Sequence, residues 1–193
     1  GEMKRLTYLA AQSLVSGWLD DNTILVASNA FEPQRTPTIC AITKDGGMPV
    51  SYNLGPAINV SVSARGNVVL ERNSHRPDPA HWKRYRGGTA GKLWYADSLD
   101  GEFRPLIRLN GNLARPLWIG DRVYFLSDHE GTANIYSCDG TGAGLARETA
   151  HKDFYARNPS TDGRTIVYHA GAKIYSYDVA AKKSAEIPVE YFS

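Results

Sequence analysis

The sequence is poor in cysteine, in net charge and in long apolar runs, and each shortage excludes a class of protein. Its 193 residues include only two cysteines, Cys40 and Cys138, which form no C-x-x-C pair and are too few for a secreted disulfide framework. The formal net charge is +2, and the basic residues are spread along the chain, which argues against a nucleic-acid-binding protein. No apolar run approaches the roughly 20 residues that cross a membrane, so we expect no membrane partner.

The start of the chain also lacks the apolar core of a secretory signal peptide, which favours a cytoplasmic protein. Hydrophobic residues make up 42% of the sequence, enough to build a core, and this excludes a disordered chain. The 18 glycines, 10 prolines and 11 tyrosines are typical of a turn-rich β protein.

Helical periodicity is almost absent, and short alternating runs separated by Asp, Asn and Gly turns recur instead. These runs predict an all-β protein. Residues 1–10, with a strand at Met3–Ala10, resemble the last strand of a preceding unit. Four units of four strands follow, at residues 13–54, 57–109, 114–149 and 154–189.

The four units repeat with a regular period. Equivalent apolar residues in their second strands are Ile24, Val68, Val123 and Ile166, at spacings of 44, 55 and 43 residues. Two of these spacings match the roughly 40–45-residue period of a four-stranded propeller blade. The longer interval contains an insertion at residues 73–91.

A single four-stranded sheet cannot bury both of its faces, whereas sheets packed around an axis bury their apolar side chains against neighbouring sheets. A β-sandwich also has short alternating strands, but its strands would not repeat in groups of four. We therefore predict a β-propeller of four-stranded antiparallel blades, with about four blades of a larger ring. Arg115-Pro116 and Asn158-Pro159 occupy matching positions in two first strands, where proline is tolerated.

The insertion contains the least generic run of the sequence, HWKRYRGGTAGKLW at His81–Trp94. Its glycines could bring backbone N–H groups together as an anion-binding nest, to which the arginines would add charge. The alternative is a folded insertion in which Arg84 and Arg86 pair with carboxylates or stack on Trp82 and Tyr85. We favour the alternative, because the run matches neither a phosphate-binding loop nor a dinucleotide-binding fingerprint.

No motif indicates catalysis or metal binding, so we expect no catalytic residue, no metal site and no cofactor. The histidines show no zinc-ligand spacing, and no G-x-S-x-G turn occurs. A Ser-His-Asp triad is defined by geometry, so that possibility stays open, although nothing favours it. The acidic stretches Asp128–Thr132 and Asp139–Gly142 offer too few oxygens for calcium and are interpreted as turns. The histidines are His75, His81, His129, His151 and His169.

The run PAHWKRYRGGTAGKLW at Pro79–Trp94 resembles a motif of the tricorn protease family, in its first, six-bladed β-propeller. The shared pattern is Trp-Lys-x-Tyr-Arg-Gly-Gly-Thr-x-Gly-Lys-(Ile/Leu)-Trp, in the same position between strands. Further matches are Lys4–Tyr8, Asn53–Pro56, Arg122–Asp128 with Gly131, Ile135–Ser137 and Thr161–Arg164. The resemblance covers nearly the whole chain.

The resemblance implies a part of a large cytoplasmic serine peptidase, a hydrolase that assembles as a hexamer and acts in proteolysis. Its catalytic residues lie in C-terminal domains, so this chain would be a non-catalytic propeller portion that scaffolds the enzyme and guides peptides. Its partners would be peptides, the remaining domains and other copies. Lys83, Arg84, Tyr85 and Arg86 are then candidates for a peptide path or an interface.

One departure from the family stands out. The arginine pair that the family places after the strand matching Lys4–Tyr8 is missing from Leu9–Gly17 (LAAQSLVSG), and two of the six blades are absent. The alternative to a peptidase portion is a stand-alone TolB-like propeller module that binds a protein or a ligand.

Overall fold

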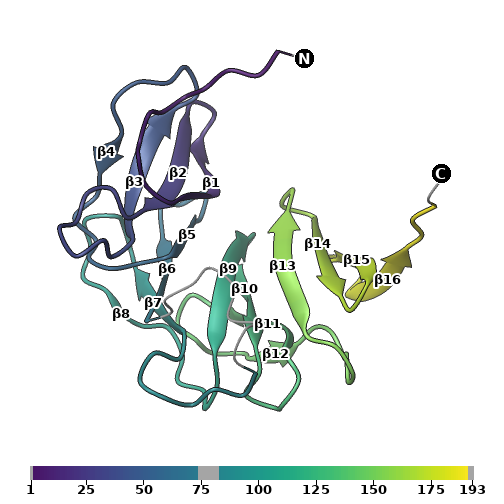
Figure 1. Cartoon of the computed structure of the whole chain (residues 1–193). Coiled ribbons are helices and arrows are strands. Elements are labelled where there is room, and N and C mark those ends of the chain that lie inside the picture. The colour runs from purple at the N-terminus through teal and green to yellow at the C-terminus, as the bar shows by residue number, and fades with distance from the viewer. Residues whose placement is uncertain (1, 74–82, 191–193) are drawn as a thin grey trace.

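The computed structural model describes residues 2–73 and 83–190, and these residues contain sixteen β-strands and no helix. The strands form four antiparallel sheets, each made of four consecutive strands in chain order. Figure 1 shows the sheets side by side along an arc, with the first strand of each toward the inside and the last toward the outside. The prediction of an all-β propeller with four-stranded antiparallel blades is confirmed.

The four sheets are called blades 1 to 4. Blade 1 contains β1 (Ser13–Asp20), β2 (Thr23–Ser28), β3 (Thr38–Thr43) and β4 (Val50–Ser51). Blade 2 contains β5 (Asn59–Val62), β6 (Val68–Arg72), β7 (Lys92–Ala96) and β8 (Arg104–Pro105). Blade 3 contains β9 (Leu113–Ile119), β10 (Arg122–Ser127), β11 (Asn134–Asp139) and β12 (Ala146–Arg147). Blade 4 contains β13 (Ala156–Thr161), β14 (Thr165–Ala170), β15 (Lys173–Asp178) and β16 (Lys183–Ile187).

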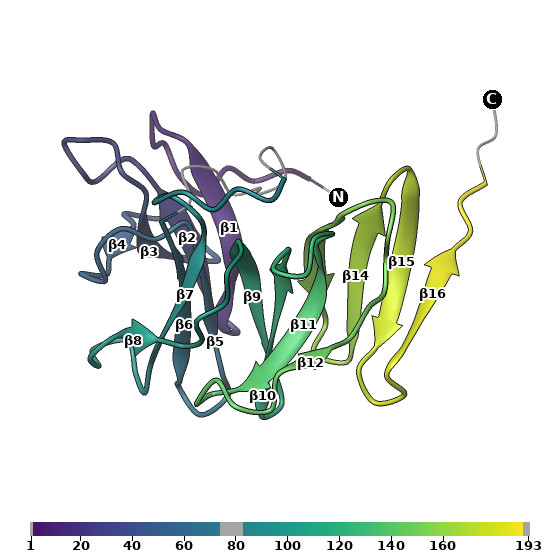
Figure 2. The ribbon, with the colours of Figure 1, turned by 90° about the horizontal axis from the view of Figure 1, so that it is seen from below.

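The apolar core lies between the blades, as β10 illustrates. Val123 and Phe125 point to one face and pack in a cluster with strands of blade 2. Tyr124 and Leu126 point to the other face and pack in a cluster with strands of blade 4. Because successive side chains of a strand alternate between faces, a strand between two blades is buried on both sides. Figure 2 shows the blades stacked face to face in this way.

The N-terminal segment covers part of a blade face instead of extending a sheet. The strand expected at Met3–Ala10 does not form, because no described strand pairs with it. Leu6 packs instead against Val26, Cys40 and Ile42, which lie on the face of blade 1 turned away from blade 2. The segment therefore contributes apolar burial to blade 1 rather than ladder hydrogen bonds.

The outermost strands are shorter than the sequence predicts. β4 and β8 have two residues each, where strands were expected over Met48–Leu54 and Phe103–Leu109. An outermost strand has a partner on one side only. Pro49 and Pro105 also lack the N–H group that would extend the ladder.

The innermost strands β9 and β13 are bulged at their proline dipeptides. The pairing register shifts at Arg115-Pro116 and again at Asn158-Pro159. Arg115 and Asn158 have φ angles of 54° and 47°, in the left-handed region that residues other than glycine seldom adopt. The bulges bring Nη2 of Arg115 to 3.5 Å from Oδ1 of Asn158, which links blade 3 to blade 4.

Candidate functional site

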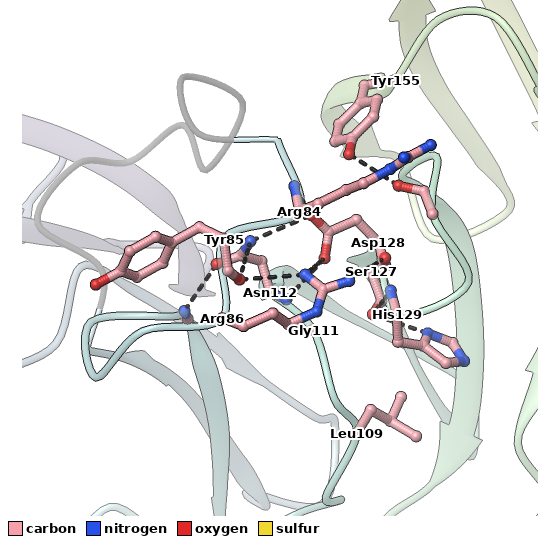
Figure 3. A network of polar contacts seen from close by, with 12 residues as sticks. Arg84, Tyr85, Arg86, Leu109, Gly111, Asn112, Ser127, Asp128, His129 and Tyr155 are labelled. Carbon is pink, nitrogen blue, oxygen red and sulfur yellow. Dashed lines mark hydrogen bonds and ion pairs between the residues drawn. The ribbon is translucent and has the colours of Figure 1, made fainter.

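The predicted site residues Lys83, Arg84, Tyr85 and Arg86 lie in the insertion between β6 and β7. His75, His81 and Trp82, which the sequence also singled out, lie outside the described residues. From Lys83 onward, the insertion crosses from blade 2 to blade 3, where it meets the connection that follows β10 (Figure 3).

The insertion is fastened to a single buried carboxylate, that of Asp128. Oδ2 accepts hydrogen bonds from the backbone N–H of Arg84 at 2.9 Å and from Nδ2 of Asn112 at 3.2 Å. Oδ1 accepts hydrogen bonds from the backbone N–H of Asn112 at 2.9 Å and from Nη1 of Arg86 at 3.0 Å. The Asp128 side chain is only 2% exposed, so its charge depends on these donors for solvation.

Arg86 is the counter-ion of this carboxylate. Besides the ion pair, its Nη2 donates to the backbone carbonyl of Asp128 at 2.9 Å and its Nη1 donates to the carbonyl of Tyr85 at 3.1 Å. A charge pair with such additional hydrogen bonds offsets the cost of its own desolvation. The prediction that the arginines of the run pair with carboxylates is confirmed for Arg86.

Asn112, in the connection between β8 and β9, ties the insertion from its other side. Its Nδ2 donates to the carbonyl of Tyr85 at 3.2 Å, and its Oδ1 accepts from the N–H of Gly91 at 3.3 Å. Lys92 Nζ donates to the carbonyl of Gly111 at 3.3 Å. The two ends of the Tyr85–Gly91 loop are therefore fixed to the same connection.

Two glycines of the motif lie in close contacts, and the contact of Gly91 is with backbone that cannot move aside. A Cβ on Gly91 would lie 2.5 Å from the carbonyl oxygen of Leu113, and one on Gly87 would overlap the ring of Tyr85. The Tyr85 hydroxyl also accepts a hydrogen bond from Oγ1 of Thr89 at 3.1 Å. The Gly-Gly-Thr run thus forms a compact loop beside a tyrosine ring, consistent with the favoured interpretation of a folded insertion.

Lys83 and Arg84 remain exposed at the outer side of this anchor. Lys83 Nζ lies 5.4 Å from the centroid of the Tyr155 ring, and the Tyr155 hydroxyl donates to the carbonyl of Gly131 at 2.8 Å. The backbone of Arg84 has a φ angle of 57°. Its guanidinium lies beside Gly131, with Nη2 3.7 Å from the position that a Cβ on that glycine would occupy. Burial, and next the charge of Asp128, raise the pKa of Tyr155.

A catalytic triad near the anchor would have to use Ser127, His129 and Glu130, which lie close together. Ser127 Oγ lies 3.0 Å from Nδ1 of His129, whose Nε2 is 4.0 Å from Oε1 of Glu130. The hydroxyl is inaccessible to a substrate, because Ser127 is 1% exposed. Burial lowers the pKa of His129, while the charges of Glu130 and Asp128 act in the opposite direction. This trio therefore provides no nucleophile.

Within the described ranges, no three His, Cys, Asp or Glu side chains are placed to hold a metal ion. Asp139, interpreted as a turn residue, accepts from the N–H groups of Thr141 and Ala143 at 2.8 and 3.0 Å. Asp128 also belongs to a turn, in which the N–H of Gly131 donates to its backbone carbonyl at 2.9 Å, and its side chain is in addition the centre of the anchor. The sequence marks both segments, as the motif around Arg86 and the family match over Arg122–Asp128, but neither pattern indicates that the two segments pair.

Comparison with known proteins identifies the family. Residues 1–183 match the family described as the tricorn protease N-terminal beta propeller domain. This chain belongs to that family. It is 35% identical over 185 residues to the tricorn protease of Thermoplasma volcanium, covering 92% of the chain and 18% of that protein.

Comparison with solved structures supports the same family assignment, and it also finds the propeller fold in other proteins. A crystal structure of the tricorn protease superposes with a TM-score of 0.88 at 31% identity, over 100% of this chain and 19% of that chain. A TolB protein from Agrobacterium tumefaciens gives a TM-score of 0.68 at 13% identity, over 88% of this chain and 62% of that one. At that identity the likeness shows the fold alone.

The chain thus spans about a fifth of the length of its tricorn relatives and corresponds to their N-terminal propeller. In the described parts of the chain, no helix is long and apolar enough to cross a membrane.

Proposed function

We propose that the chain is a non-catalytic propeller portion of a tricorn-like serine peptidase, which scaffolds the enzyme and guides peptide substrate or product. The observation that carries this proposal is the anchored insertion of a tricorn-family propeller. Asp128 holds the backbone of Arg84 and the side chain of Arg86, and leaves Lys83 and Arg84 exposed as two cations at one end of the blades.

Two exposed cations on a fixed backbone attract carboxylates and the carbonyl dipoles of a peptide without binding them tightly. Tyr85 and Arg86 act differently in this proposal. Tyr85 fills the loop and Arg86 neutralises Asp128, so both position the cations rather than meet the peptide themselves.

The proposal extends to the whole protein. The proposed partners are peptides, the remaining domains of the parent peptidase and further copies in a hexamer. The proposed location is the cytoplasm. A stand-alone TolB-like module is the alternative from a different class. A reading frame that continues into a peptidase domain supports the first proposal, and one that stops soon after Ser193 supports the alternative.

The experiment that tests the proposal uses the chain alone with chromogenic peptides. We expect no hydrolysis, and we expect weak peptide binding that increases in strength at low salt, because exposed charges are screened by ions. Replacing both cations, Lys83→Ala with Arg84→Ala, should abolish that salt-dependent binding. Hydrolysis that a serine-directed inhibitor blocks would show that the chain is catalytic and would overturn the proposal.

A further inference from the structure

The last residue of the second strand is an arginine in one blade only. It is Ser28 in blade 1, Ser127 in blade 3 and Ala170 in blade 4, but Arg72 in blade 2. Blades of the same architecture form with small residues at this position, so the fold itself does not require the arginine.

The Arg72 side chain lies between blades 1 and 2, where it is held by two aromatic rings. Its guanidinium carbon is 5.2 Å from the ring centroid of Trp94 and 5.4 Å from that of Phe103. Its Nη2 donates to the carbonyl of Leu54, in the linker between the blades, at 2.6 Å. The rings and the carbonyl fix the orientation of the planar group.

The hydrogen-bonding capacity of Arg72 is only partly used. Its Nε is buried and has no hydrogen-bond partner. No carboxylate of the described residues lies within ion-pair distance of its guanidinium. Leaving a charged donor buried and unpaired is costly, and native proteins seldom do so without a reason.

Arg72 also lines two recesses between these blades. The smaller, of about 230 Å³, is bounded by Pro37 and Pro56. The larger, of about 620 Å³, is bounded by Asn53 on the blade 1 side and by Asp100 on the blade 2 side. The larger volume falls in the range of small-ligand sites, which are roughly 300–1,000 Å³.

The chemistry of these recesses selects the ligand. A guanidinium with unused donors matches a carboxylate, whose two oxygens accept parallel hydrogen bonds. Asp100 in the same cleft adds a negative charge beside the single cation, which weakens the binding of any anion and disfavours a doubly charged anion such as phosphate more than a single carboxylate.

We propose that Arg72 and the larger recess form a binding site for a single carboxylate group. The carboxylate comes either from a small organic acid or from a Glu or Asp side chain of a protein segment. The site lies between blades 1 and 2, whereas the Asp128 anchor joins blades 2 and 3, so it does not rest on the proposed peptide-guiding function.

The test is a titration of the isotope-labelled chain, monitored by NMR at the arginine Nε–Hε groups. The probes are sodium propionate, the capped peptide acetyl-Gly-Glu-Gly-amide, its Gln counterpart and inorganic phosphate. We expect the Arg72 signal to shift and saturate with a carboxylate probe, and to remain in place with the Gln peptide and with phosphate. Saturation by propionate alone identifies a small acid as the ligand, and saturation by the Glu peptide identifies a protein side chain.

Variants provide the second arm of the test. Arg72→Lys retains the positive charge but loses the planar guanidinium that donates two parallel hydrogen bonds. Binding of the carboxylate probe should therefore weaken by at least about tenfold. Arg104→Lys is the matched control, because Arg104 stacks on Tyr95 in the same blade but already lies 3.8 Å from Asp97. Any one of three results would overturn the proposed site. These are equal shifts of the Arg72 signal with the Glu and Gln peptides, no saturation with either carboxylate probe, and an unchanged carboxylate affinity in Arg72→Lys. The peptide comparison uses the unaltered chain, so it decides the question even if Arg72→Lys unfolds.

Discussion

Asp128 is the residue on which the position of the insertion depends. Its buried carboxylate accepts four hydrogen bonds, from Arg84, from Arg86 and twice from Asn112. Removing such a group leaves buried donors without partners, which costs more than the pair itself contributes.

Asp128→Ala is therefore expected to lower the free energy of unfolding by about 3–5 kcal/mol. Urea denaturation of the chain measures this loss. Because the two residues share one interaction, adding Arg86→Ala to the Asp128→Ala variant should lower the free energy of unfolding by less than Arg86→Ala does alone. The control is Arg65→Ala, which breaks an ion pair to Asp121 whose side chains are 79% and 80% exposed. That control should change stability by no more than about 1 kcal/mol. Equal losses in Asp128→Ala and the control would contradict the role of the anchor.

His151 makes the stability of the chain depend on pH. Its Nε2 lies 2.9 Å from the hydroxyl of Tyr168, and its ring centroid lies 4.8 Å from that of Tyr175. Burial, and next the charge of Arg147, lower the pKa of His151 below its ordinary value of 6.5. Below that value the unfolded chain takes up a proton that the folded chain resists, so stability falls as the pH decreases and is fully present above it.

We expect the urea midpoint of the chain to fall between about pH 7 and about pH 5. His151→Gln should reduce this fall, leaving the part due to other groups such as His129, whose pKa burial also lowers. An unchanged pH dependence in His151→Gln would show that the imidazole does not contribute.

At the scale of the elements, the strands could be predicted and the anchor could not. Alternation and Asp-Gly turns are local signals, and they located β2, β10 and β14 because each is short and bounded by turns. The pairing of Asp128 with Arg86 spans blades 2 and 3, and is determined by how those blades pack. The lengths of β4 and β8 also escaped prediction, because an edge strand depends on its single neighbour.

The start of β7 depends on a glycine that no strand pattern reveals. A Cβ on Gly91 would lie 2.5 Å from the carbonyl oxygen of Leu113, a backbone atom that cannot move independently of β9. We expect Gly91→Ala to destabilise the chain by about 1–3 kcal/mol. Gly88→Ala, where a Cβ meets no atom within 4 Å, is the matched control in the same loop. Thermal unfolding compares the two, and equal melting temperatures would refute the contact.

At the scale of the whole molecule, both terminal blades leave apolar side chains exposed on their outer faces. On blade 1, Leu6 covers Val26, Cys40 and Ile42. Val15 and Trp18, which pair with Val26 and Ile24 on the same face, remain 66% and 58% exposed. On the outer face of blade 4, the side chains of Val167, Ile174 and Ile187 are 41%, 40% and 36% exposed. Ile174 pairs with Ile187 across β15 and β16, so these apolar side chains form part of one surface.

Exposed apolar sheet surface favours association. We therefore expect the chain to self-associate as its concentration rises, and the double variant Val167→Thr with Ile174→Thr to do so less, since threonine retains the strand preference. Sedimentation velocity over a concentration series measures this. A strictly monomeric, stable species across the series would contradict the expectation.

The proposed peptide-guiding role of the anchored insertion is tested most directly by steady-state kinetics of the proposed parent peptidase, with and without Lys83→Ala and Arg84→Ala. If the anchored insertion guides peptides, the variant should show a higher KM, or a lower kcat/KM, with kcat unchanged, and the effect should shrink at high salt. The control Arg65→Ala should behave as the unaltered enzyme. Unchanged kcat/KM in a folded Lys83→Ala and Arg84→Ala variant at low salt would show that these two cations do not guide peptides.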